Sequence, residues 1–194
     1  MTKIIGLTGG IGSGKTTVIN YIASKNIPVY IADEAGKYIM EKPEVIKQVN
    51  TLFNNEVLLH NGLLDRKKIA EIVFNNKEKL EVLNGIVHPA VAKDFEDFVK
   101  QNQNSNLIVK ESAILFESGA YKVCDASILV TAPEQIRIER VVKRDHVAEE
   151  EVLKRMRNQM SDEEKAKLSD FVITNIDLQE TYNQIDKVLE EILT

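Results

Sequence analysis

The sequence contains a single cysteine, Cys124, and no tryptophan. One cysteine excludes an intramolecular disulfide and fits a reducing compartment. No apolar run approaches the roughly 20 residues that a membrane-spanning helix needs. Nothing at the N-terminus resembles a signal peptide, because the first predicted strand already begins at Lys3. We therefore expect a soluble, cytoplasmic protein.

The chain also lacks an excess of basic residues. Its 194 residues include 25 Lys and Arg against 30 Asp and Glu, a formal net charge of −5. This balance disfavours nucleic acid as the main partner, because binding a phosphate backbone needs clustered positive charge. The length is near that of one domain, and 43% hydrophobic residues can form a proper core. We expect one domain that binds small molecules, as a monomer or a small homo-oligomer.

Glycine is scarce but concentrated in one stretch. Residues 9–16, GGIGSGKT, match the phosphate-binding loop G-x-x-x-x-G-K-[ST]. Apolar residues 4–7 precede the loop and predict a buried parallel strand, and residues 17–23 can continue as a helix. Strand, glycine-rich turn and helix is the context that this motif requires. The alternative, a turn that binds nothing, is disfavoured by that complete context.

The residue types of the motif suit a polyphosphate. Successive backbone N–H groups can wrap phosphate oxygens only where glycine permits a tight turn, including positive φ. The helix that follows directs its N-terminal dipole and unpaired N–H groups at the anion. Lys15 adds a mobile positive charge, and Thr16 offers a hydroxyl to Mg²⁺.

Four further segments have strand character: residues 27–31, 107–110, 127–131 and 171–174. Their alternation with helical segments predicts a doubly wound α/β domain with parallel strands. Asp33 and Glu111 follow the ends of two of these strands, where open parallel sheets collect ligands. Asp33 is a candidate substrate-binding residue or a helix N-cap. A carboxylate such as Glu111 can hold Mg²⁺ through water.

A long helical region lies between the second and third strands. Asp65 is a candidate cap of one of its helices, and the polar residues 101–106 predict a loop. Pro89 removes a helix hydrogen bond and disfavours helical geometry at His88. We therefore expect a kink or a helix junction at His88, and spacing alone favours a structural role for it.

A strongly charged helix is predicted after Pro133. Arg137, Arg140 and Arg144 are three and four residues apart and share one face. Such a face is a candidate lid that closes over phosphates. The alternative is a solvated face paired with nearby acids. Pattern alone leaves both open.

Taken together, these segments resemble the dephospho-CoA kinase family along nearly the whole chain. Residues 7–18 look like that family's first motif, and His88-Pro89 matches its His-Pro pair. Residues 111–117, ESAILFE, are similar to its acid-x-Pro-Leu-Leu-Phe-Glu segment, but Glu111 replaces the more usual aspartate and Ala113 replaces the proline. Ile31 stands where the family has an aspartate. The remaining similarities lie at Arg140, Arg144-Asp145, Arg155, Gln159, Lys165, Ser169-Asp170 and residues 173–175.

The resemblance implies transfer of phosphate from ATP to the ribose 3′-hydroxyl of dephospho-CoA, the last step of coenzyme A synthesis, with Mg²⁺. The implied catalytic residues are Asp33, Lys15 and Arg140. The implied ATP-binding residues are Gly10, Ile11, Gly12, Ser13, Gly14, Lys15, Thr16, Thr17 and Arg144. Asp33, His88 and Glu117 are implied to bind the acceptor, and Thr16 and Glu111 the metal.

The expected fold is a three-layer P-loop NTPase fold with a five-stranded parallel sheet, a helical substrate-binding insert and a helical lid. Within a single kinase domain, the core covers about residues 1–33, 105–135 and 168–194. The insert covers about 34–104 and the lid about 136–165.

Two other functions fit part of the sequence. A kinase for another nucleoside or nucleotide shares the architecture, because the acceptor pocket cannot be deduced from spacing. A nucleotide-dependent switch that regulates a partner is a rival from another class. The chain has no Asn-Lys-x-Asp guanine signature, and its arginine-rich helix suits a kinase lid better than a switch.

Overall fold

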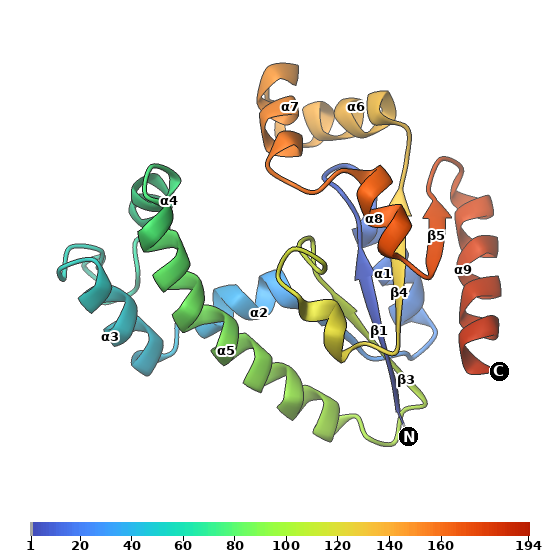
Figure 1. Cartoon of the computed structure of the whole chain (residues 1–194), viewed down its shortest axis with the longest axis horizontal. Coiled ribbons are helices and arrows are strands. Elements are labelled where there is room, and N and C mark those ends of the chain that lie inside the picture. The colour runs from blue at the N-terminus through green and yellow to red at the C-terminus, as the bar shows by residue number, and fades with distance from the viewer. Residues whose placement is uncertain (1) are drawn as a thin grey trace. The chain divides into compact units, whose positions relative to one another are not determined.

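The computed structural model describes residues 2–194 (Figure 1). The chain forms two compact units. One, the sheet unit, comprises the chain up to Ile31 together with Asn102–Thr194. The other, the helical unit, comprises Ala32–Gln101. The expected division into core, insert and lid stays a prediction.

Five parallel strands form one sheet in the order β2-β3-β1-β4-β5. They are β1 (Lys3–Thr8), β2 (Val29–Ile31), β3 (Leu107–Glu111), β4 (Ala126–Thr131) and β5 (Phe171–Thr174). Each strand coincides with or overlaps a predicted segment. β1 lies at the centre, with β3 on one side and β4 on the other. The strand order therefore reverses at β1, and ligands collect at the carboxyl ends beside such a reversal.

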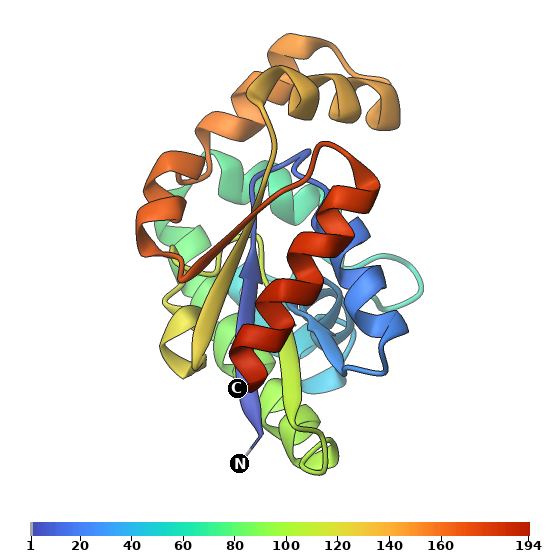
Figure 2. The same cartoon turned by 90° about the vertical axis from the view of Figure 1, so that its right-hand side faces the viewer.

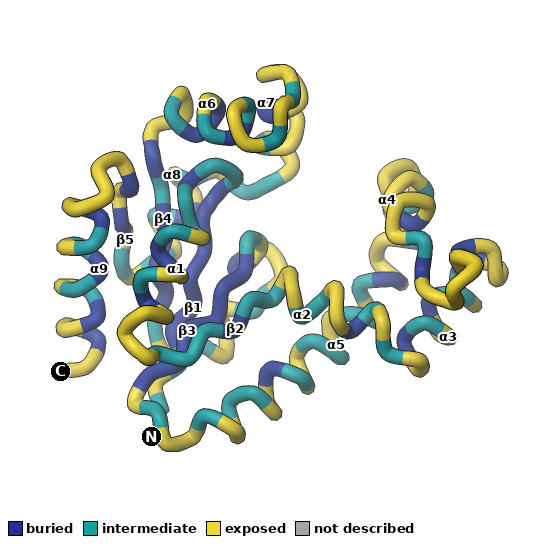
Figure 3. The backbone as a smooth tube through the Cα atoms, turned by 180° about the vertical axis from the view of Figure 1, so that it is seen from behind, coloured by how far each residue is buried: buried dark blue, intermediate teal, exposed yellow. Residues whose placement is uncertain are grey.

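Helices α1 (Lys15–Ser24) and α9 (Leu178–Leu193) lie side by side over one face of the sheet (Figure 2). Their apolar residues interdigitate with alternate residues of the strands. Strands β1, β3 and β4 are buried over most of their length, whereas α9 buries one side only (Figure 3). The resulting core contains Ile5, Leu7, Val18, Ile19, Ile22, Leu107, Val109, Ile128, Val130, Ile173, Ile185, Leu189 and Ile192.

The opposite face of the sheet is covered by residues 112–124, including the short helix η1 (Ala120–Val123), and by α8 (Asp162–Leu168) beside β4. A Cβ atom on Gly6 of β1 would lie 2.7 Å from Leu115 and 3.1 Å from the Cys124 sulfur. Glycine therefore lets this layer approach the sheet closely. Burial raises the pKa of the Cys124 thiol to about 11. Two covered faces confirm the predicted three-layer α/β fold.

Helices α6 (Glu134–Asp145) and α7 (Glu149–Arg157) lie beyond the carboxyl ends of β1 and β4 (Figure 1). We call the segment from α6 to α7, residues 134–157, the α6–α7 hairpin. The turn between the helices uses His146 in a left-handed conformation, with φ of 54°. Ile138, Val141 and Val152 form its small apolar core. α8 begins with a capping box, in which Ser161 and Glu164 bond reciprocally.

The helical unit consists of α2 (Ala32–Ile39), α3 (Pro43–Leu52), α4 (Arg66–Phe74) and α5 (Lys77–Gln101). Asp65 caps α4 as predicted, since its side chain accepts from the Lys68 N–H. α5 continues through Pro89, so the expected helix junction at His88 is wrong. The reason is packing on both sides of the proline, where apolar residues of α5 contact the core of this unit and outweigh one lost hydrogen bond. Among residues 2–194, no helix combines the length and hydrophobicity needed to cross a bilayer.

Candidate active site

The glycine-rich loop joins the end of β1 to the start of α1. Gly12 and Gly14 have φ of 79° and 90°, a region that disfavours any residue with a Cβ atom. The Ser13 N–H donates to the Gly10 carbonyl at 3.1 Å. Gly14 is the N-cap of α1. The loop is therefore a tight turn that ends at a helix N-terminus, as the motif predicts.

Neighbouring residues pack closely against this loop. A Cβ atom on Gly14 would lie 1.9 Å from Asn175 Nδ2, which donates to the Ser13 carbonyl at 2.8 Å. Asn175 is buried in the segment after β5, and its Oδ1 accepts from the Thr181 hydroxyl. The amide side chain thus ties the loop to the start of α9.

Two buried polar groups at the loop have no hydrogen-bond partner among the residues that the structure describes: Ser13 Oγ and Arg140 Nη1. Arg140 Nη1 lies 3.7 Å from the position of a Cβ atom on Gly14. An unpaired buried donor is costly unless a ligand satisfies it. A phosphate fits because its oxygens accept from both groups, and the N-terminus of α1 favours a negative charge there.

Lys15 and Glu111 come together beside the loop. β1 and β3 pair in register with Leu7 opposite Glu111, so both strands end at the same level. Lys15 Nζ donates to the Gly9 carbonyl at 2.8 Å and lies 3.9 Å from the buried Glu111 carboxylate. The lysine is thus already at the phosphate-binding turn.

The same edge offers oxygen ligands for a divalent cation. Glu111 supplies a carboxylate and Thr16 a hydroxyl, which suit hard ions such as Mg²⁺. Within residues 2–194 no group of three or more His, Cys, Asp or Glu could hold a metal alone. This fits Mg²⁺, which usually takes one or two protein ligands together with phosphate oxygens and water.

The three arginines of α6 have three different environments. Arg137 is buried and forms an ion pair with Asp162 at 2.8 Å. Arg140 directs an unpaired Nη1 at the loop, as described above. Arg144 is exposed and donates to Asp145, and this hydrogen bond lowers the pKa of the Asp145 carboxyl. Arg144 therefore matches the expected solvated face that pairs with a nearby acid. Arg140 does not, because its Nη1 is buried and unpaired among the described residues.

Glu117 takes part in a separate network. Its carboxylate lies 3.1 Å from Nζ of Lys165 and accepts from the Met160 N–H at 3.1 Å. Lys165 is fully buried and also donates to the Ala113 carbonyl at 2.8 Å. This network fixes the start of α8 to residues 113–117. A role of Glu117 in substrate binding stays a prediction.

Asp33 and His88 belong to the helical unit. Asp33 is exposed in the first turn of α2, two residues after β2 ends, and not at an N-cap position. An acid there is favourable with respect to the helix dipole. His88 is an exposed residue inside α5. Their roles toward a substrate also stay predictions.

Three residues at the loop were not among the candidates chosen from the sequence: Gln159, Asp162 and Asn175. Arg137 was considered there only as part of the candidate lid face, without a role of its own. Gln159 and Asn175 lie in segments that resemble the family, without an assigned role. Asp162 carries no local signal, because its partners Arg137 and Thr131 come from distant parts of the chain.

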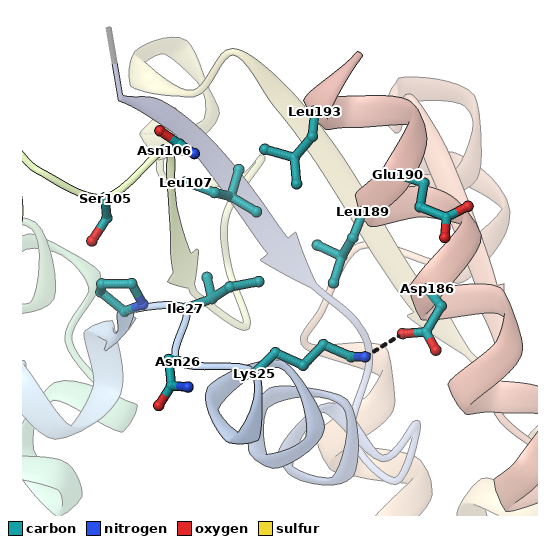
Figure 4. A pocket seen from close by; sticks show the side chains of 11 residues that line it. Lys25, Asn26, Ile27, Ser105, Asn106, Leu107, Asp186, Leu189, Glu190 and Leu193 are labelled. Carbon is teal, nitrogen blue, oxygen red and sulfur yellow. Dashed lines mark ion pairs between the residues drawn. The ribbon is translucent and has the colours of Figure 1, made fainter.

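A hollow lies at the other end of the sheet. It has a volume of about 480 Å³ and is lined by Lys25, Asn26, Ile27, Pro28, Ser105, Asn106, Leu107, Asp186, Leu189, Glu190 and Leu193 (Figure 4). Lys25 and Asp186 form an ion pair at 2.8 Å within it. It lies at the amino ends of the strands, opposite the phosphate-binding loop. We therefore place the candidate active site at the loop.

Comparison with known proteins identifies the relatives of this chain. The family model described as dephospho-CoA kinase matches residues 3–180. The dephospho-CoA kinase of Fusobacterium nucleatum is 42% identical over 190 residues, covering 97% of this chain and 98% of that protein. The chain belongs to the dephospho-CoA kinase family. Another member, from Oceanobacillus iheyensis, is 37% identical and covers 98% of each chain.

Solved structures agree with this assignment to the dephospho-CoA kinase family. A crystal structure of TT1252 from Thermus thermophilus has a TM-score of 0.92 and 35% identity, covering 100% of this chain and 98% of that one. The dephospho-CoA kinase of Campylobacter jejuni has a TM-score of 0.66 and 26% identity, covering 98% and 97%. A shikimate kinase from Bacteroides thetaiotaomicron, at 12% identity and a TM-score of 0.52, shares the fold alone.

Proposed function

We propose that this protein transfers the terminal phosphoryl group of ATP to the ribose 3′-hydroxyl of dephospho-CoA, giving coenzyme A and ADP. The observation that carries the proposal is the phosphate-binding loop with two orphaned polar groups, Ser13 Oγ and Arg140 Nη1, in a chain of the dephospho-CoA kinase family. The names of the relatives supply the acceptor, and the loop supplies the phosphate chemistry.

Residues 10–17 hold the phosphates of ATP in this proposal. Lys15 leaves the Gly9 carbonyl and the Glu111 carboxylate, its partners in the structure, and approaches the transferred phosphoryl group. Arg140 offers its unpaired Nη1 to the same group. Two cations are needed because the transition state spreads negative charge over three equatorial oxygens. Catalysis of this kind depends on positioning and on charge stabilisation.

Mg²⁺ would be held by Thr16 directly and by Glu111 directly or through water, and when bound it neutralises charge on the phosphates. Glutamate is one methylene longer than the aspartate typical of the family's segment, so we expect Glu111 to reach further from β3. The Glu111 carboxylate lies 3.9 Å from Lys15 Nζ, which places it near the phosphate-binding turn.

Asp33 is the proposed base. It orients the acceptor hydroxyl and takes its proton late in a loose transition state, where an ordinary carboxylate suffices. Its position, shortly after the end of β2, and its exposure support contact with a substrate. His88 and Glu117 are proposed to border the acceptor, and the helical unit is proposed to shape its pocket. Arg144 is proposed to contact ATP after leaving Asp145.

The test is ADP release by the purified protein with ATP and Mg²⁺, in parallel reactions with dephospho-CoA, adenosine, AMP or no acceptor. We expect ADP only with dephospho-CoA, together with an equal amount of coenzyme A. ADP formed with a different acceptor would support the assignment as a kinase but contradict dephospho-CoA as its acceptor. ADP release that is independent of any acceptor would instead favour a nucleotide-dependent switch.

Asp33→Asn tests the base. The variant should lose most of its turnover, by about a hundredfold or more, while ATP still binds, because the amide cannot accept the proton. Glu34→Gln is the matched control, since it removes the neighbouring exposed carboxylate of the same helical turn. Normal turnover in Asp33→Asn would refute the assignment.

The biosynthetic role of the family supports a cytoplasmic location and small-molecule partners. We propose the same for this protein, with no nucleic acid or membrane partner and a monomeric or small oligomeric state.

A further inference from the structure

One residue of the phosphate-binding loop, Ile11, is held by the α6–α7 hairpin and the residues after it. The Ile11 N–H donates to Gln159 Oε1 at 3.0 Å, and the Ile11 carbonyl accepts from Arg137 Nε at 3.0 Å. The Ile11 side chain packs against the apolar core of the hairpin. The backbone and the side chain of Ile11 are therefore both fixed from one side.

Arg137 links the loop to a third element. While its Nε donates to Ile11, its Nη1 forms the ion pair with Asp162 at the start of α8. Asp162 also accepts from the Thr131 hydroxyl at the end of β4. The Arg137 side chain is only 8% exposed. A guanidinium suits this place because its fixed fork can serve two acceptors at once.

The glycines at positions 10 and 12 accommodate Arg137. A Cβ atom on Gly10 would lie 2.2 Å from Arg137 Nη2, and one on Gly12 would lie 2.4 Å from the Arg137 carbonyl oxygen. These distances leave no room for a side chain. Glycine at these positions is therefore required for contact with Arg137 as well as for close approach of a phosphate.

We propose that Arg137 is a positioning residue that, together with Gln159, holds the loop crest, residues 10–12, in its phosphate-binding conformation before any nucleotide arrives. The crest then does not have to be ordered on binding, and the conformational entropy of its residues is not lost at that step. The inference rests on the proposed function only for the identity of the nucleotide, ATP.

The proposal gives two neighbouring arginines separate tasks. Arg137 directs Nε and Nη1 at acceptors within the protein, and Arg140 keeps Nη1 without a partner among residues 2–194. They lie three residues apart on α6 and so share a face. Arg137 prepares the loop, and Arg140 remains available for the ligand.

The first experiment measures hydrogen exchange of the amides in residues 9–14 without nucleotide. Gln159→Met keeps the length of the side chain but removes the acceptor of the Ile11 N–H. We expect exchange of these amides to become at least about tenfold faster while β1 and β4 exchange as before. Gln135→Met is the matched control, because Gln135 is exposed on α6 and its amide donates to Glu139, away from the loop.

The second experiment uses Arg137→Lys. Lysine keeps the charge for Asp162 but cannot also donate to Ile11 from a rigid fork. We expect ATP to bind about tenfold more weakly, with kcat at saturating ATP changed less than about twofold, because the ordered loop is the same once ATP is bound. Arg157→Lys, at an exposed position of α7, is the control.

Unchanged exchange in Gln159→Met overturns the proposal, as does unchanged ATP affinity in Arg137→Lys. A large loss of kcat with normal ATP affinity also overturns it, because Arg137 would then act on the chemistry. The exchange experiment contains no ATP and no acceptor. The exchange result therefore tests the role of Gln159 even if the proposed kinase function is wrong.

Discussion

Helix α1 has a lysine at each end, and the two lysines show how the ends of the sheet differ. Lys15 is the first residue of α1 and lies at the phosphate-binding loop, 3.9 Å from Glu111. Lys25 is the C-cap of the same helix and lies in the hollow at the amino ends of the strands (Figure 4). Both side chains have acidic neighbours, yet the buried groups differ: among residues 2–194, Asp186 Oδ1 at the amino end is ion-paired with Lys25, whereas Ser13 Oγ and Arg140 Nη1 at the loop have no such partner.

At the amino end the polar side chains bond to one another. Asp186 lies 2.8 Å from Lys25 Nζ and also accepts from the Tyr21 hydroxyl at 2.9 Å. Tyr21 stacks on Tyr182 with ring centroids 3.9 Å apart. These contacts join α1 to α9. At the carboxyl end, Ser13 Oγ and Arg140 Nη1 are buried without partners among the described residues. The difference indicates that one end is built for stability and the other for a ligand.

The largest effect is expected from Lys15→Ala compared with Lys25→Ala. Lys15→Ala should lower kcat by about a hundredfold to a thousandfold, because it removes the positive charge that stabilises the transferred phosphoryl group. Lys25→Ala removes the same side chain from the other end of α1 and should change kcat by less than about twofold. Steady-state kinetics of both variants makes the measurement. Equal losses in the two would contradict the functional difference between the ends.

Gly14→Ala tests how closely the loop is packed. We expect ATP to bind at least about tenfold more weakly, because alanine is strained at a φ of 90° and its Cβ would displace Asn175. Gly119→Ala shares the positive φ, but its new Cβ would meet only Lys122 Cε, at 3.9 Å. Titration calorimetry with ATP compares the two. A similar loss of ATP affinity in Gly119→Ala would mean that backbone strain in general, and not close packing at the loop, weakens binding in Gly14→Ala.

Asn175→Asp should act on stability first. The substitution replaces the donor to the Ser13 carbonyl by a carboxylate oxygen, and the site is buried. We expect a loss of about 2–3 kcal/mol in the free energy of unfolding at pH 7. The same change at exposed Asn106, at the amino end, should stay within about 0.5 kcal/mol.

Denaturant titrations of both variants at pH 7 and pH 4 test the cause. The loss in Asn175→Asp should shrink at pH 4 because the buried carboxyl is then more protonated. A loss independent of pH would mean that charge is not its cause.

The smallest effect concerns Asp186. The hydrogen bond from Lys25 is the main cause that lowers the pKa of the Asp186 carboxyl below its usual value of 3.8. Its contribution to stability is therefore present at neutral pH and is lost as the pH falls from near 3.8 toward the lowered pKa. Asp186→Asn should have a slightly lower Tm than the parent at pH 7, and the gap should narrow near pH 3. Glu190→Gln, on the same helix, should show no such gap. A gap that widens toward acid pH would contradict this account.

The sequence was informative where chemistry is local. The loop at residues 9–16, the strands and the cap at Asp65 depend on neighbours in the chain, and the structure confirms them. The helix junction expected at His88 was wrong because packing on both sides of Pro89 keeps α5 continuous. Local propensity was outweighed there by tertiary contacts.

The surroundings of the loop could not be predicted in the same way. Arg137 contacts Ile11 across 126 positions of sequence, and Asn175 contacts Ser13 across 162. No local pattern encodes such pairs. Spacing placed Arg137, Arg140 and Arg144 on one face but could not say that Arg137 is buried while Arg144 pairs with Asp145 in solvent.

The most direct test of the central claim follows the transferred phosphate itself. The purified protein is incubated with ATP, Mg²⁺ and dephospho-CoA, and the product is examined by ³¹P NMR, with Lys15→Ala and Lys25→Ala in parallel. The account predicts a new monophosphate on the ribose 3′-oxygen with the parent and Lys25→Ala, and almost none with Lys15→Ala. A phosphate on another atom, or equal product from all three proteins, would contradict it.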